Sequence, residues 1–186
     1  MAKNIWDGYS EVHMTDERTE NLIAECLRQE ESCLYTSAGL YIWQKRSRVW
    51  KNIFIVAPIV LGGVASSQIL SDSDNKLTSY AAAGLALLAG FFPAIYEALG
   101  MDMRVREIGA SAAEFNNLKD RFRVLATVKA HSEFEEFDAA FEQLMDRMDA
   151  ARSTSPPLPE WCFEKARLKI EGGDYAFKID EKEAKV

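Results

Sequence analysis

Few of the residues that commonly do chemistry in proteins stand here in patterns that support catalysis. The 186-residue chain has two histidines, His13 and His131, and neither has a cysteine or a serine elbow beside it in the sequence. Nucleophilic catalysis needs a base next to the nucleophile, and no such arrangement is recognisable. Neither a phosphate-binding glycine loop nor an H-E-x-x-H motif occurs. The sequence therefore predicts a protein that is not an enzyme.

The cysteines also give no sign of a bound metal or cofactor. Cys26, Cys33 and Cys162 are odd in number and include no C-x-x-C pair, which argues against a disulfide framework or a zinc site. Cys26 and Cys33 are seven residues apart and therefore share one face of a helix. The sequence predicts that both lie on a buried apolar stripe.

The apolar residues are concentrated in the middle of the chain, whereas both ends are rich in charge. Residues 53–70, IFIVAPIVLGGVASSQIL, carry no charged side chain, and residues 77–99 carry only Glu97. A helix needs about 20 mostly apolar residues to cross the hydrocarbon of a bilayer, and proline and glycine are tolerated there. We therefore predict transmembrane helices over 53–70 and 77–99, joined by the polar turn SDSDNK.

Basic residues gather on the outer flanks of the two predicted spans. Six such residues lie just before the first span or just after the second: Lys45, Arg46, Arg48, Lys51, Arg104 and Arg106. The positive-inside rule then places both termini in the cytoplasm of a multi-pass protein of the inner (cell) membrane. The formal net charge of −7 argues against nucleic acid as a partner, which leaves the lipid bilayer.

Helical periodicity continues on both sides of the spans. Residues 1–14 read as an irregular segment, and Thr15 or Asp16 is expected to cap a helix that runs without a break into the first span. After the second span, apolar residues recur three and four apart, as in the seam of a coiled coil. The two seams comprise Phe115, Leu118, Phe122 and Leu125, and then Phe134, Phe137, Phe141, Leu144 and Met148.

The predicted fold is all-α, a two-helix transmembrane hairpin with long cytoplasmic amphipathic helices before and after it. The main domain covers residues 15–152. Residues 153–186 begin with the linker STSPPLP, followed by a short amphipathic helix and a mobile tail. The apolar residues of that helix are Trp161, Phe163, Ala166 and Ile170.

Small residues recur at every fourth position of the second span. They are Ala82, Ala86, Gly90, Ala94 and Ala98, and the first span has Gly62 and Gly63 each four residues before a serine. Small residues at this spacing allow two helices to approach closely. The pattern is compatible with packing inside one chain and with packing between chains. A homo-oligomer is expected for a separate reason, since one two-helix hairpin cannot enclose a channel.

Four polar residues within the spans are candidates for a water path or for helix pairing. Ser66, Ser67 and Gln68 form a patch near the outer end of the first span, and they either line a pore or form hydrogen bonds between helices. Glu97 lies near the cytoplasmic end of the second span. An acid inside a span is costly unless it meets water or a partner. Glu97 is therefore an interfacial acid or a pore-mouth acid facing Lys51 or Asn52.

The order of these segments follows a recognisable pattern. A long amphipathic helix ends in LYIWQKRSRVW (40–50), and a proline-bearing span, a short turn and a small-residue span come after it. The segment EIGASAAEFNNLKDRFRVLA (107–126) follows, then a helix starting near Glu133, Pro-Pro and WCFEKARLKI. This layout, over residues 15–152, resembles the SLATT family, the two-transmembrane effector domains of bacterial conflict systems.

The resemblance implies an effector of antiviral defence that forms a pore or disrupts the inner membrane. It also implies a cytoplasmic trigger, with a sensor or a synthase of a nucleotide second messenger as the partner system. The residues leave a second interpretation open, in which the hairpin only anchors the cytoplasmic helices. The protein would then be a scaffold without a pore, which recruits a cytoplasmic partner through its apolar seams.

Overall fold

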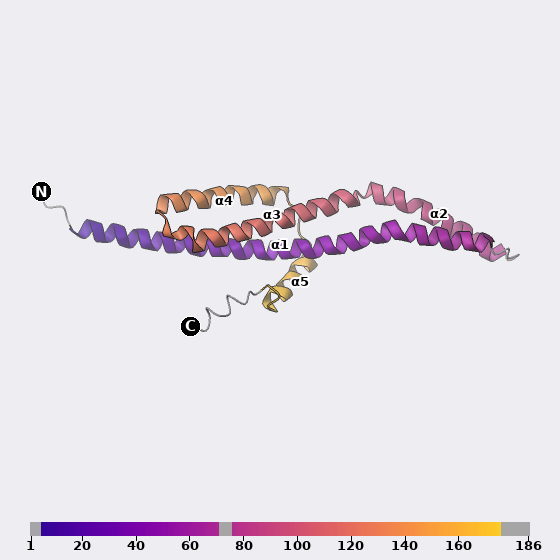
Figure 1. The fold of residues 1–186 in the computed structure, drawn as a ribbon, viewed down its shortest axis with the longest axis horizontal. Coiled ribbons are helices and arrows are strands. Elements are labelled where there is room, and N and C mark those ends of the chain that lie inside the picture. The colour runs from indigo at the N-terminus through magenta and orange to yellow at the C-terminus, as the bar shows by residue number, and fades with distance from the viewer. Residues whose placement is uncertain (1–4, 71–75, 176–186) are drawn as a thin grey trace. The chain divides into compact units, whose positions relative to one another are not determined.

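The computed structural model describes residues 5–70 and 76–175, with side chains for 17–67 and 79–175. All secondary structure within these ranges is helical, with no strand (Figure 1). The elements are α1 (Ile5–Leu70), α2 (Lys76–Ala98), α3 (Met101–Thr127), the short 3-10 helix η1 (Lys129–His131), α4 (Phe134–Thr154) and α5 (Glu160–Glu171). The predicted turn at 71–75 and the tail at 176–186 lie outside the described residues.

The first helix starts earlier than the sequence predicts. Helix α1 begins at Ile5, so the expected irregular segment up to Met14 and a start at Thr15 or Asp16 are wrong. The first 14 residues contain one glycine and no proline, and a single glycine costs a helix only about 1 kcal/mol. The predicted unbroken passage into the first apolar segment is confirmed, because α1 continues to Leu70 and contains Pro58.

The chain divides into two compact units. Unit 1 comprises Met1–Ile42 and Ile108–Val186, and unit 2 comprises Trp43–Glu107. Helices α1 and α3 each contribute residues to both units. Each unit has its own set of contacts, which are described separately below.

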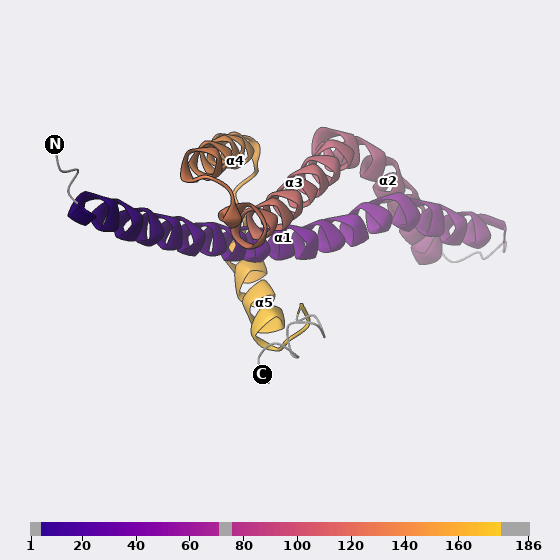
Figure 2. The same cartoon turned by 60° about the vertical axis from the view of Figure 1, so that its left-hand side comes forward.

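Unit 1 is built around the predicted seam of α3. Phe115, Leu118, Phe122 and Leu125 are all at most 3% exposed, which confirms this seam. One cluster of the core joins Cys26 of α1 to Leu125 and Ala126 of α3 and to Phe137 of α4. Figure 2 shows α4 and the end of α3 beside this part of α1.

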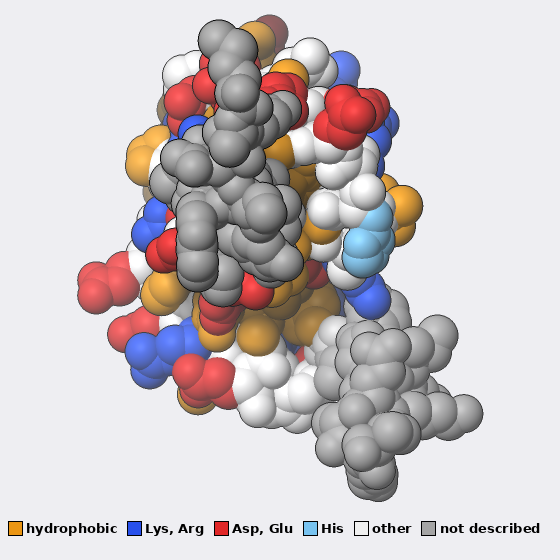
Figure 3. All heavy atoms as spheres, turned by 90° about the vertical axis from the view of Figure 1, so that its left-hand side faces the viewer, with side chains coloured by type: hydrophobic (Ala, Val, Ile, Leu, Met, Phe, Trp, Pro, Cys, Tyr) orange, Lys and Arg blue, Asp and Glu red, His pale blue; other side chains and the backbone are white. Residues whose placement is uncertain are grey.

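The predicted buried stripe of α1 is also present in unit 1. Cys26 and Cys33 are 0% and 1% exposed, and the Cys33 thiol lies 3.6 Å from the sulfur of Met148 on α4. In Figure 3, charged side chains lie around the edge of this end of the molecule, with apolar side chains between them. This segregation is the ordinary result of burying one stripe of each amphipathic helix.

Helix α5 buries only part of the apolar face that the sequence predicts. Cys162 and Ala166 are buried, whereas Trp161 and Phe163 are exposed. The contact is close because the segment before α5 passes over Gly39 of α1. A Cβ atom at Gly39 would lie 2.6 Å from Leu158 Cδ2, closer than any ordinary contact.

Candidate functional site

The apolar segments of unit 2 pack against each other in opposite directions. The rings of Phe54 on α1 and Phe92 on α2 have centroids 5.7 Å apart. Further along, the Gln44 side-chain amide donates a hydrogen bond of 3.5 Å to the carbonyl oxygen of Val105. Higher residue numbers on α1 thus pair with lower numbers on α2 and α3, so α2 folds back along α1.

On both helices, the residues that face the other helix recur alternately three and four positions apart. On α2 the inward face, buried or half-buried, consists of Ala82, Leu85, Ala89, Phe92 and Tyr96. On α1 the corresponding residues are Phe54, Pro58, Leu61 and Ala65. Ala65 and Ala82 are each 2% exposed, so the closest packing involves the smallest side chains. Close approach of small residues is the usual means of helix contact where apolar surface faces lipid.

Most of the strip of small residues on α2 lies outside this contact. Ala82 is buried, but Ala86, Gly90, Ala94 and Ala98 are exposed. The reason is geometric, since an α-helix has 3.6 residues per turn and a four-residue step advances about 40° around it. Added Cβ atoms at Gly62, Gly63 and Gly90 would meet nothing within 4 Å. Packing within the chain therefore does not require glycine at these positions.

The outer faces of both helices are strongly apolar and exposed. Ile59 and Leu87 are 71% and 66% exposed, and in each apolar window only 6% of residues are buried. A core helix of a soluble domain would be mostly buried, and exposed apolar patches of this extent mark an interaction surface. By length and composition, the helical stretches Glu17–Ser67 and Ser79–Ala98 are each able to cross a membrane.

A charged contact lies at the end of this pair, where α3 begins. The Lys51 amine pairs with the Asp102 carboxylate, and this contact lowers the pKa of Asp102 below its usual value. The Tyr96 hydroxyl is buried nearby but lacks the geometry of a hydrogen bond, so we assign the pKa shift chiefly to Lys51. The sequence left Glu97 as an interfacial acid or as a pore-mouth acid facing Lys51 or Asn52. Lys51 pairs instead with Asp102, and Glu97 is exposed, as an interfacial acid would be.

The other basic residues of the flanks are exposed around this contact. Lys45, Arg46 and Arg48 precede the first apolar segment, and Arg104 and Arg106 follow the second. Arginine and lysine can reach lipid headgroups from such positions because their long stems are apolar and their tips are charged. Half of the Trp50 side chain is also exposed in this region, as is common for aromatic residues at a membrane interface.

The two serines of the polar patch form hydrogen bonds within their own helix. Ser66 donates to the carbonyl oxygen of Gly62 and Ser67 to that of Val64, each at 2.8 Å. Both serines are exposed, and the side chain of Gln68 lies outside the described residues. Serine in this arrangement offers a lone pair outward without leaving an unsatisfied donor.

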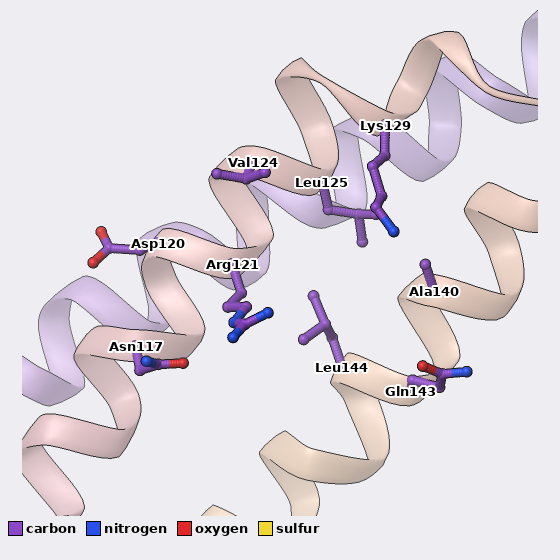
Figure 4. Close-up of a pocket in the computed structure, with 9 residues that line it drawn as sticks. All are labelled: Asn117, Asp120, Arg121, Val124, Leu125, Lys129, Ala140, Gln143 and Leu144. Atoms are coloured by element: carbon purple, nitrogen blue, oxygen red, sulfur yellow. The ribbon is translucent and has the colours of Figure 1, made fainter.

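Unit 1 contains a second polar site that the sequence did not suggest. Arg147 of α4 forms two hydrogen bonds to Glu114 of α3, at 2.6 and 3.0 Å, and a third of 3.1 Å to Asn117. The Arg147 guanidinium lowers the pKa of Glu114. Close to this pair, a cavity of about 360 Å³ lies between α3 and α4 (Figure 4). No sequence motif links these residues, because Arg147 lies on α4, whereas Glu114 and Asn117 lie on α3.

The described part of the chain contains no group of three or more His, Cys, Asp or Glu residues that could hold a metal ion. The candidate sites are the exposed apolar faces of unit 2, its basic end, and the space between α3 and α4. No protein-family model, no curated protein and no solved structure matches this chain.

Proposed function

We propose that the chain is a pore-forming or membrane-disrupting effector of a bacterial conflict system, set in the inner membrane as a transmembrane hairpin. The observation that carries the proposal is the combination of exposed apolar helices with an outward strip of small residues. A cytoplasmic signal triggers assembly, and the resemblance to the SLATT family suggests a nucleotide second messenger. The infected cell then loses its membrane potential.

Length and exposure support the membrane location. Helix α2 has 23 residues, which at 1.5 Å per residue gives about 35 Å, slightly more than the hydrocarbon thickness. Exposed side chains such as Ile59, Leu87 and Phe91 are favourable in lipid and costly in water. The segments before the first span and after the second then lie in the cytoplasm.

Charge supports the same orientation. Lys45, Arg48, Arg104 and Arg106 are exposed at one end of the apolar pair, where anionic lipid of the cytoplasmic leaflet would attract them. The Lys51–Asp102 pair neutralises two charges that would otherwise stand close to the hydrocarbon. In this orientation Glu97 is an acid at the cytoplasmic interface.

The outward strip of α2 supports assembly between chains. One pair of helices is too few to enclose a water path, so a pore needs several copies. Ala86, Gly90 and Ala94 provide a flat surface for another helix, since they are exposed and small. Ser66 and Ser67 would then contribute hydroxyl oxygens to the water path.

The proposal is tested by reconstituting the full chain in liposomes and measuring release of a trapped dye. We expect Gly90→Leu to reduce release strongly, because a leucine on the strip keeps a second helix at a distance. The matched control is Gly84→Leu on the same helix, about 120° away from Gly90 and equally free of neighbours within 4 Å. Gly84→Leu is expected to retain release.

Cross-linking of single cysteines gives a second measurement of the same assembly. Ala86→Cys should form dimers on mild oxidation, whereas Gly84→Cys should not. Equal release from Gly90→Leu and Gly84→Leu would contradict the role of the strip. A chain that never releases dye, under any candidate signal, would contradict the pore itself.

A second candidate function is a membrane-anchored scaffold without a pore. The exposed Trp161, Phe163 and Leu168 of α5 favour it, because large apolar side chains on a short helix suit a protein partner. Replacing both spans with unrelated apolar helices distinguishes the two functions. A scaffold retains its cellular effect after this exchange, and a pore loses it.

A further inference from the structure

The cavity between α3 and α4 lies wholly within unit 1 and has the size of a small-molecule site. Its volume is about 360 Å³, within the range typical of ligand pockets. Helix α3 forms one wall with Val124 and Leu125, and α4 forms the other with Ala140 and Leu144. The apolar wall would accommodate the body of a small organic molecule.

Two unpaired cations point into this space. Figure 4 shows that the side chains of Arg121 and Lys129 both extend from the α3 side toward Leu144 and Ala140. Neither cation has an ion-pair partner among the described residues, although the chain as a whole is acidic. A guanidinium and an ammonium that line the same space without a counterion can form a site for an anion.

The one acid that lines the cavity does not neutralise these cations. The Asp120 carboxylate points away from the cavity in Figure 4 and pairs with Lys119 at 3.1 Å. The carbonyl oxygen of the Asn117 side chain is likewise occupied, because it accepts a hydrogen bond from Arg147. The remaining polar group, the Gln143 amide, is available as a donor or an acceptor.

We propose that this cavity binds a small organic phosphate, with the phosphate between Arg121 and Lys129 and an aromatic or aliphatic body against Val124, Leu125 and Leu144. Phosphate is the preferred anion because guanidinium binds it through two parallel hydrogen bonds and ammonium supplies a further charge. The size of the cavity limits the ligand to roughly one ring system and one phosphate. The proposal does not depend on whether the protein forms a pore.

Binding is tested with the full chain in nanodiscs of zwitterionic lipid, using 1-naphthyl phosphate as the probe and titration calorimetry as the measurement. We expect saturable binding that Arg121→Gln and Lys129→Gln each weaken by about tenfold or more, the usual loss for a hydrogen bond to a charged group. Lys165→Gln is the control, since it removes an exposed cation on α5 that lies outside the cavity. This variant is expected to bind as the unmodified chain does.

Two further probes separate the parts of the site. Inorganic phosphate alone and 1-naphthol alone are each expected to bind much more weakly than 1-naphthyl phosphate. Equal binding by either probe would overturn the proposal, because one half of the site would then contribute nothing. No saturable binding at millimolar probe, or equal weakening by Lys165→Gln, would overturn it as well. The helical circular dichroism of each variant confirms that it is folded.

Discussion

Lys51 of α1 forms an ion pair with Asp102, the second residue of α3, although the whole of α2 separates them in sequence. The ion pair joins α1 to α3 at the end of unit 2 where the apolar segments give way to the basic residues. Because Asp102 also lies in the first turn of α3, the helix dipole favours its negative charge. One carboxylate therefore serves both the contact to α1 and the start of α3.

Loss of the amine is expected to change the titration of Asp102. In Lys51→Met the pKa of Asp102 should rise toward its usual value, since Lys51 is the main cause of its lowering. The carboxyl carbon shift of Asp102, followed by NMR against pH, measures this change. Lys45→Met removes an exposed lysine from the same flank and should leave the Asp102 titration where it is. An unchanged Asp102 titration in Lys51→Met would show that another group lowers its pKa.

The pair of Arg147 and Glu114 predicts how the stability of unit 1 depends on pH. The folded-state pKa of Glu114 is lowered, so its stabilising contribution is present above the unfolded pKa and is lost as pH falls through the folded pKa. The contribution should be below about 1 kcal/mol, because both side chains are more than a third exposed. We expect Glu114→Gln to lower the thermal midpoint at neutral pH and not at strongly acidic pH. Glu142→Gln, an exposed acid of α4, serves as the control, and a similar loss at both pH values in Glu114→Gln would argue against the ion pair.

The aromatic centre of unit 1 predicts a large effect of truncation. Phe122 is fully buried, and its ring lies 6.2 Å from that of Phe141, measured between centroids. Phe122→Ala should cost about 3–5 kcal/mol, because it removes a large side chain and leaves a cavity. Val124→Ala, two residues along the same helix and 52% exposed, should change stability by less than about 0.5 kcal/mol. Denaturant unfolding of both variants in detergent gives the comparison, and equal losses would mean that α3 presents a different face to the core.

Because Leu158 lies close to Gly39 and nothing lies close to Gly63, glycine-to-alanine substitutions at these two positions are expected to change stability in opposite directions. Gly39→Ala should weaken the docking of α5 by up to about 1 kcal/mol, the low end of the usual cost of overpacking, because the new methyl displaces only the end of the Leu158 side chain. Gly63→Ala should stabilise α1 by up to about 1 kcal/mol, because its Cβ meets nothing and alanine favours a helix. Limited proteolysis at the segment before α5 reports the docking. Adding Leu158→Ala should restore the protection that Gly39→Ala removes, and a failure to do so would place the clash elsewhere.

The sequence predicted the features that depend on periodicity. The three-four spacing of Phe115, Leu118, Phe122 and Leu125 placed them on one face, and all four are buried. The limits of the second apolar segment were also close, because α2 runs from Lys76 to Ala98 against the predicted 77–99. Local patterns of this kind predict the buried face correctly because each helix buries a single stripe.

The features that depend on contact between distant residues were missed. Nothing in the sequence distinguishes Asp102 from Glu97 as the partner of Lys51, since both acids lie near the same helix end. The stripe of α5 was assigned to Trp161, Phe163, Ala166 and Ile170, but only Ala166 of these is fully buried, together with the unassigned Cys162. Arg121 and Lys129 line one cavity only because η1 turns the chain so that α4 lies beside α3.

Helix α2 carries two surface patterns that favour opposite crossing senses. Its inward residues alternate by three and four, a pattern that packs with a left-handed crossing of about 20°. Its outward small residues repeat strictly by four, which favours a right-handed crossing of about 40°. A helix of a second chain that docks on Ala86, Gly90 and Ala94 would therefore cross α2 with one handedness, whereas α1 of the same chain crosses α2 with the other. Contacts within and between subunits would then not be interchangeable, so exchange of α2 between neighbouring chains is disfavoured by geometry.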